Sequence, residues 1–145
     1  MGIVSSATHG FGVINMLLVK TRIDLSKIHG IGLFADEFIR KGTVTWRFLD
    51  GFDLRLPESI LGMLSAPARE QFLKYTYVDP VSGLYELCAD DARFFNHSDE
   101  PNTASVQLSP DEEVDMATRD INQGEELTCD YRTFDRDWRK KLGRS

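Results

Sequence analysis

The sequence contains few cysteines, and this scarcity limits the chemistry that the protein can use. Cys88 and Cys129 are the only two among 145 residues. Two cysteines cannot supply a four-cysteine zinc site or a framework of several disulfides. The sequence therefore predicts no metal site and favours a reducing, intracellular compartment, which is the cytoplasm or, in a eukaryote, the nucleus.

Long hydrophobic runs are also lacking. No apolar stretch approaches the roughly 20 residues that a transmembrane helix requires, so we expect a soluble protein with no membrane partner. Residues Met1–Ser6 fit the N-myristoylation pattern, but this short pattern occurs often by chance. Because the first strand-like run opens at Met16, we interpret residues 1–15 as an N-terminal extension outside the fold.

Positive charge is the third deficit, since 17 lysines and arginines stand against 23 aspartates and glutamates and leave a net charge of -6. Phosphate contacts need a basic surface, so direct binding to nucleic acid is not expected. The summed field of the chain instead favours a basic protein or peptide partner. Acidic residues cluster in segments 90–91, 99–100, 111–115 and 125–126, although solvated turns explain most such clusters equally well.

The remaining composition is that of one globular domain. Hydrophobic residues make up 41% and charged residues 28% of the chain, which is long enough for one core. Alternating patterns and turn residues predict a mostly β protein of short strands, with a glycine-containing hairpin at Gly30 and Gly32 and two further hairpins around residues 79–83 and 109–113. Strands are predicted for residues 16–23, 33–35, 43–49, 75–78, 84–88, 103–108, 114–118 and 127–128. Helical spacing predicts two short helices between residues 50 and 74, starting near Pro57 and Ser65.

Two segments place polar side chains directly after strand-like residues. In the first, two aromatics that favour burial, Phe94 and Phe95, precede the polar run Asn96-His97-Ser98. In the second, segment 124–131 runs from a glycine turn through a short strand to Asp130-Tyr131. Such strand ends commonly line a small-molecule pocket. Taken alone, the first segment is explained equally well as a turn, because Asn, Ser, Asp and Pro are ordinary turn residues.

Taken together, these segments resemble the SET-domain protein lysine methyltransferases. Gly30-Ile31-Gly32 is similar to the first motif of that family, segment 93–102 to the central motif, and segment 125–131 to the last motif. The resemblance implies several small sheets with a short helical insert and a pseudoknot-like threading of the C-terminal segment. It further implies a SET domain over residues 16–131 and a tail over residues 132–145.

The same resemblance implies S-adenosylmethionine (AdoMet) as cofactor and a lysine of a protein as methyl acceptor. Its cofactor-binding residues would be Gly30, Ile31, Gly32, Asn96, His97 and Tyr131. Phe134 and Trp138 of the tail are four residues apart and would share one face of a helix, where they either cover the adenine end or simply pack. Tyr131 would be the catalytic tyrosine, assisted by Tyr75. The lysine channel would be lined by Tyr75, Tyr77 and Cys129, where Tyr75 and Tyr77 are expected to share one strand face.

Two departures from the family keep other functions open. Asp99 stands where the family often has cysteine, and Cys129 where it usually has an aromatic residue two positions before the tyrosine. One alternative is a catalytically inactive SET fold that only holds a peptide. Another is an unrelated small β protein in which the motifs are turns. The sequence indicates no particular substrate protein, degree of methylation or oligomeric state.

Overall fold

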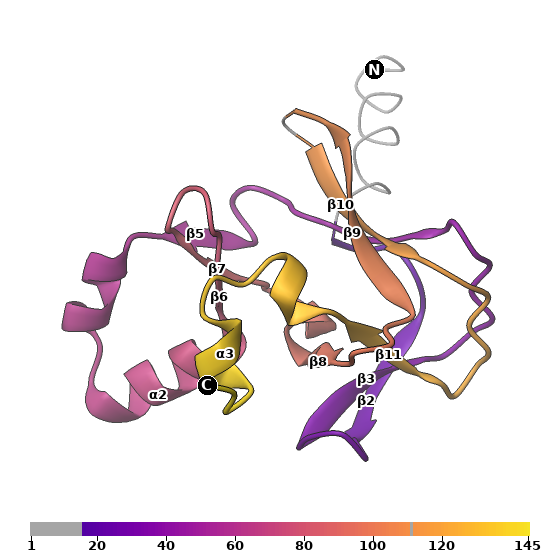
Figure 1. Ribbon diagram of the computed structural model, residues 1–145, viewed down its shortest axis with the longest axis horizontal. Coiled ribbons are helices and arrows are strands. Elements are labelled where there is room, and N and C mark those ends of the chain that lie inside the picture. Colours follow the sequence, from indigo (N-terminus) through magenta and orange to yellow (C-terminus); the bar gives the residue numbers. More distant parts are fainter. Residues whose placement is uncertain (1–15, 111) are drawn as a thin grey trace, which may run out of the picture.

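Three small β-sheets form the framework of the computed structural model, which describes residues 16–110 and 112–145 (Figure 1). The first sheet is antiparallel throughout and has the order β1-β4-β10-β9. Its strands are β1 (Met16–Leu17), β4 (Val44–Arg47), β10 (Glu112–Ala117) and β9 (Thr103–Ser109). The β9–β10 hairpin stands upright in Figure 1 and supplies one wall of the site described below.

The second sheet joins segments that are far apart in the sequence. Its order is β2-β3-β11-β8, with β2 (Thr21–Leu25), β3 (Ile31–Ala35), β11 (Glu126–Cys129) and β8 (Asn96–His97). The β2–β3 pair is the predicted glycine-containing hairpin, and Gly30 in its turn has φ +49°. β8 and β11 pair in parallel, with Thr128 opposite Asn96 and Cys129 opposite His97. This pairing brings the two polar motifs together.

The third sheet and two helices form an insert between β4 and β8 in the sequence. This insert lies to one side of the other two sheets (Figure 1). The sheet has the order β5-β7-β6, with β5 (Leu54–Leu56), β7 (Tyr85–Leu87) and β6 (Tyr77–Val78). The helices are the 3₁₀ helix η1 (Glu58–Met63) and the α-helix α2 (Ala66–Tyr75). Ser65 caps α2 by accepting a hydrogen bond from the backbone of Ala68. None of the ten residues of α2 is buried, so its packing on the body of the protein is light.

Three short helical turns flank the polar motifs. They are the 3₁₀ helices η2 (Asp91–Phe94) and η3 (Tyr131–Thr133) and the α-helix α3 (Trp138–Lys141). The side chain of Lys141 in α3 donates a hydrogen bond to the carbonyl of Thr76, the residue that follows α2. The tail therefore closes against the end of the helical insert (Figure 1).

The core lies where the first two sheets meet. Leu33, Ile39, Ile121 and Leu127 are almost completely buried there. Ile39 and Ile121 also pair through backbone hydrogen bonds of 2.8 Å in each direction. Each fully buried aliphatic side chain contributes about 1.5–3 kcal/mol. This core fixes the ends of β3 and β11, from which the site residues project.

The predicted mostly β architecture, its hairpins and its two insert helices are confirmed, but three local predictions are wrong. Residues 16–23 do not form one strand, because their two ends join different sheets. The Leu18 N–H donates to the Thr45 carbonyl of the first sheet, whereas the Lys20 carbonyl accepts from the Asp36 N–H beside the second sheet. Residues 54–56, expected in the helical segment, form β5.

The third error concerns the aromatic residues of the site. Tyr75 ends α2 and is not on a strand, because Thr76 terminates the helix with two hydrogen bonds to the Phe72 carbonyl. Tyr75 and Tyr77 therefore do not share a strand face. Phe94 closes η2 instead of a strand, since the Asp90 side chain caps the turn by accepting from Ala92.

The helices described in residues 16–110 and 112–145 are all too short or too polar to cross a membrane. Within the same residues, no three or more His, Cys, Asp or Glu side chains gather as metal ligands would. The predicted extension, residues 1–15, lies outside the described part of the chain.

Candidate active site

Asn102, at the end of the central motif, fastens that motif to the last one. Its side-chain NH2 donates to the Glu126 carbonyl at 2.8 Å, and its Oδ1 accepts from the Thr128 backbone at 2.9 Å. Thr103 adds a hydrogen bond of 2.8 Å from its hydroxyl to the Thr128 carbonyl. Because these groups are buried, the bonds fix the register of β11 beside the central motif.

Asn96 connects this junction to the β2–β3 hairpin. Its buried side-chain NH2 lies 3.0 Å from the His29 carbonyl, 3.3 Å from the Ile31 carbonyl and 2.9 Å from Oε1 of Glu126. The two amide hydrogens are therefore committed to the protein. No donor among the described residues bonds to Oδ1 of Asn96. The amide can therefore offer an external ligand an acceptor but not a donor.

Glu126 lies against the glycine motif, and sequence reasoning missed it. Its Oε2 accepts from the Ser26 hydroxyl at 2.9 Å, and its Oε1 accepts from Asn96. A Cβ atom added to Gly32 would lie only 2.0 Å from Oε1 of Glu126. Gly32 is therefore needed for the close approach of this carboxylate. The Glu pair after Gly124 was visible in the sequence, but its target on the hairpin was not.

His97 holds the backbone of Tyr131. The Tyr131 N–H donates to Nδ1 of His97 at 3.1 Å, so Nδ1 is an acceptor and the ring proton belongs on Nε2. Nε2 in turn lies 2.8 Å from Oδ1 of Asp99. Arg144 of the tail also bonds to this carboxylate, at 3.2 and 3.3 Å. The hydrogen bonds from His97 and Arg144 lower the pKa of Asp99 to about 2. Asp99 thus gives the histidine a charged anchor.

The phenol of Tyr131 points back to the central motif. Its hydroxyl donates to the Phe95 carbonyl at 2.6 Å. The ring lies between His97, at a centroid distance of 5.4 Å, and Phe134, at 5.8 Å. Burial raises the pKa of the Tyr131 hydroxyl above its ordinary value, so the group stays neutral at physiological pH. It is placed to orient a reacting group, not to act as an anionic base.

A cavity of about 660 Å³ opens beside Tyr131. Five of the predicted site residues line it, namely Tyr75, Tyr77, Cys129, Tyr131 and Phe134. The other predicted residues, Gly30, Ile31, Gly32, Asn96, His97 and Trp138, are not in its lining. All of these except Trp138 lie on the hairpin and on β8. We call the predicted residues on the hairpin and on β8 the hairpin-and-β8 group. Tyr131 contacts β8 and also lines the cavity, so it stands between this group and the cavity residues.

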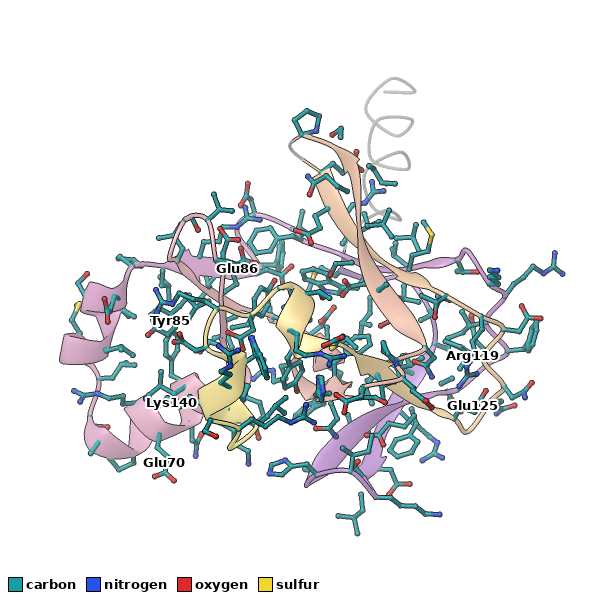
Figure 2. The ribbon with its side chains drawn as sticks, in the orientation of Figure 1. Glu70, Tyr85, Glu86, Arg119, Glu125 and Lys140 are labelled. Atoms are coloured by element: carbon teal, nitrogen blue, oxygen red, sulfur yellow. The ribbon has the colours of Figure 1, made fainter. Side chains whose placement is uncertain are left out.

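The two channel tyrosines have different surroundings. Tyr77 packs edge-on against Phe134 at a centroid distance of 5.1 Å, and its hydroxyl donates to Glu86, which Figure 2 labels. Burial, followed by the Glu86 charge, raises the pKa of Tyr77. Tyr75 instead packs against Phe94 at 5.5 Å. The ring of Phe134 thus lies against both Tyr77 and Tyr131, whereas Tyr75, which the sequence interpretation named as the tyrosine that assists Tyr131, packs elsewhere.

The tail does not place Phe134 and Trp138 on one helix, because Phe134 follows η3 and Trp138 begins α3. Phe134 lies in the aromatic wall, and Trp138 lies under the guanidinium of Arg139 at 4.8 Å. Lys141, which sequence reasoning missed, pairs with the buried Asp135 at 3.0 Å and lies 5.4 Å from the Tyr131 ring centroid. These contacts join the tail to the end of the cavity that Tyr131 lines.

Comparison with known proteins agrees with this geometry. The SET domain family matches residues 30–132, from the glycine motif to just past Tyr131. The chain therefore belongs to the SET domain family. Its fold also resembles the crystal structure of a candidate histone methyltransferase from Plasmodium falciparum, with a TM-score of 0.54 and 19% sequence identity. That similarity covers 78% of this chain and 93% of the Plasmodium chain, and it supports the fold.

Proposed function

We propose that the protein transfers a methyl group from AdoMet to the side-chain amine of a lysine in a basic protein. One observation carries the proposal. The Tyr131 hydroxyl is fixed on the Phe95 carbonyl at 2.6 Å, where the hairpin-and-β8 group meets the large cavity. This arrangement fits a reaction in which cofactor and substrate approach one point from two sides.

The hairpin and β8 fit the amino-acid end of AdoMet. The Glu126 carboxylate occupies the space beside Gly32, whereas Gly30 and Ile31 are exposed and a Cβ on Gly30 would meet no atom within 4 Å, so a ligand can approach the hairpin backbone there. Oδ1 of Asn96 would accept from the cofactor's ammonium, and the main chain of His97 would line the same surface. Phe134 and Trp138 remain proposed partners of its adenine end. When bound, AdoMet supplies a methyl group on a positively charged sulfur.

The cavity fits the acceptor lysine. Tyr77, Phe134 and Tyr131 form an aromatic wall in which a lysine stem can be buried. Burial, together with a neighbouring positive charge, favours the neutral amine. Holding the amine in line with the methyl group can contribute about 7–11 kcal/mol in well-oriented systems. Tyr131 would fix that alignment.

The other reactive side chains near the cavity do not supply a nucleophile. Burial raises the pKa of Cys129 and of Cys88, so both thiols stay protonated at physiological pH. Nδ1 of His97 accepts from the Tyr131 backbone, so this nitrogen is not available as a base. Direct displacement by the lysine amine, without a covalent enzyme intermediate, is the chemistry that these environments favour.

A basic substrate follows from charge. The net charge of -6 attracts lysine-rich segments, and exposed charges are screened over about 8–10 Å near physiological ionic strength. The similarity to a candidate histone methyltransferase fits a basic protein partner. Affinity for a lysine-rich peptide should therefore fall as salt rises.

The direct test is incubation with labelled AdoMet and an array of lysine peptides, alongside calorimetric titration with AdoMet. We expect cofactor binding and label transfer to some peptides, and no measurable transfer by Tyr131→Phe. Glu70→Gln, on the exposed outer side of α2 (Figure 2), should behave as the unchanged protein does. Cofactor binding without transfer to any peptide would favour an inactive peptide-binding module. Absence of cofactor binding would overturn the proposal.

A further inference from the structure

A polar row crosses the sheet that forms one wall of the cavity. On β10, Asp115 lies directly opposite Ser105 of β9 on one side and Trp46 of β4 on the other. Directly opposed residues of antiparallel strands project from the same face. Oδ1 of Asp115 accepts from the Ser105 hydroxyl at 3.0 Å, and all three side chains line the cavity.

Among the described residues, Asp115 lacks the cation partner that two other acids of the cavity have. Glu112 pairs with Arg47 at 2.8 Å, and Glu86 pairs with Arg55 at 3.1 Å. Within the described chain, no lysine or arginine nitrogen lies within 4.0 Å of the Asp115 carboxylate. The row also contains an unused donor, because the indole N–H of Trp46, a residue only 7% exposed, has no partner in the same part of the chain.

The groups around Asp115 are neutral or negative. Burial is the largest cause that raises the pKa of Asp115; the Ser105 hydrogen bond lowers it, the Glu113 charge on the same strand raises it, and the net pKa is about 6. Cys129, Cys88 and Tyr77 face Asp115 from other elements, and its charge raises the pKa of each. A carboxylate in such surroundings is stabilised strongly by an incoming cation.

We propose that Asp115, with Ser105, is a binding subsite for a second basic side chain of the substrate, next to the lysine that is methylated. This inference rests on the proposed function, since it assigns a specificity to the same cavity. The Ser105 hydroxyl donates to Asp115 and keeps its lone pairs, so an ammonium or guanidinium can donate to both residues. The volume of about 660 Å³ is in the range that holds a whole small ligand, which leaves room for more than one side chain.

The methyl-accepting lysine is not the partner of Asp115, for a chemical reason. A carboxylate beside that amine would hold it as ammonium, and an ammonium has no lone pair for methyl transfer. Asp115 projects from β10 in the first sheet, opposite Ser105 and Trp46, whereas the Tyr131 hydroxyl bonds to the Phe95 carbonyl beside the second sheet. This separate attachment suits Asp115 to recognition.

The experiment uses the full chain and peptides with a single lysine taken from the array. Each position that flanks this lysine carries arginine in one peptide and citrulline, its neutral counterpart, in the matched peptide. We expect wild-type protein to prefer arginine at one flanking position by at least fivefold in kcat/KM, mainly through KM. Asp115→Asn should abolish that preference while methylating the citrulline peptide at the wild-type rate. Glu70→Gln should retain the preference.

A second variant keeps the test decisive if Asp115→Asn folds poorly. Ser105→Ala leaves the carboxylate in place but removes the hydrogen bond that lowers its pKa. The preference for arginine should be lost on acidification in both proteins, and at a higher pH in Ser105→Ala. A wild-type enzyme that methylates the citrulline and arginine peptides equally at every position would overturn the inference. So would an arginine preference that survives in folded Asp115→Asn. Neither result affects methyl transfer itself, on which the proposed function depends.

Discussion

The backbone N–H of Tyr131 donates a hydrogen bond to Nδ1 of His97 at 3.1 Å, while the Tyr131 hydroxyl reaches back to Phe95 at 2.6 Å. The tyrosine is thus held at both ends by consecutive parts of the central motif. Its ring has little freedom to turn without breaking one of these bonds. Such double anchoring is the kind of preorganisation that methyl transfer to a precisely placed amine requires.

His97→Ala should therefore lower turnover more than cofactor affinity. The variant removes the acceptor for the Tyr131 N–H but leaves the main chain of residue 97 in place. We expect kcat to fall by about 10- to 100-fold, because small misplacements of catalytic groups cost that much. Calorimetry should show nearly unchanged AdoMet affinity. Glu100→Gln, an exposed neighbour, is the control, and a variant with wild-type kcat would refute the positioning role.

Tyr131→Phe tests the hydroxyl itself. The change keeps the ring contacts with His97 and Phe134 and removes only the hydrogen bond to Phe95. If the hydroxyl acts on the reacting atoms, kcat should fall by orders of magnitude with cofactor affinity nearly intact. Rapid-quench measurement of a single turnover separates this effect from product release. Wild-type single-turnover rates would remove Tyr131 from the catalytic role.

Gly32→Ala should disrupt the hairpin surface. The new methyl group would displace the Glu126 carboxylate from Asn96 and Ser26, and a buried hydrogen-bonding group left without its partner costs about 1–3 kcal/mol. We expect a lower denaturation midpoint and weaker AdoMet binding. Gly62→Ala is the matched control, because a Cβ there meets no atom within 4 Å. Equal effects of the two substitutions would contradict the close-approach argument.

The fold and part of the site could be predicted from the sequence because they depend on local patterns. Gly30 and Gly32 marked the hairpin, and the polar residues after Phe95 marked the junction that β8 and β11 form. Glu126 and Asp115 were missed because their importance comes from other strands: Glu126 bonds to Asn96 of β8, and Asp115 lies between Ser105 of β9 and Trp46 of β4. No pattern within either segment carries that information.

The error over Tyr75 has a different physical origin. Its alternation with Tyr77 has the period of a strand, but the Ser65 cap starts a helix that continues through Tyr75 until Thr76 ends it. Tertiary contacts then separate the two tyrosines, one packing on Phe94 and the other on Phe134. A short aromatic repeat could not distinguish the last helical residue from the first strand residue.

Asp115 should make the free energy of unfolding fall as the pH rises from 4 to 7. Its folded-state pKa of about 6 lies above the ordinary value of 3.8, so the folded protein holds this proton more tightly than the unfolded chain does. The associated stability is present below about pH 4 and is lost as the pH rises through 6. Asp115→Asn cannot ionise and should gain about 1–3 kcal/mol over wild type at pH 7, since one pKa unit corresponds to about 1.4 kcal/mol. Urea unfolding at pH 4 and pH 7 measures this gain, which should disappear at the lower pH.

Cys129 bears on the number of methyl groups that the protein adds. It lines the cavity two residues before Tyr131, is only 7% exposed, and its Sγ lies 3.9 Å from the Asn96 carbonyl. The resemblance to other SET domains places a larger aromatic residue here. A cysteine is smaller and a poor hydrogen-bond donor, so a methylated lysine has more room to turn and present its lone pair again. The competing explanation is that another side chain fills this volume, and Tyr75 also lines the cavity while packing on Phe94.

The open-pocket explanation predicts that wild-type protein produces di- and trimethyl-lysine when cofactor is in excess. Cys129→Tyr should fill the space and stop the reaction near monomethyl-lysine, while the first transfer continues at a measurable rate. Cys129→Ser, which changes polarity but hardly changes volume, should keep the wild-type product distribution. Mass spectrometry of a peptide with one lysine distinguishes the two explanations. A wild-type reaction that stops after one methyl group would show that the volume next to Cys129 is already filled.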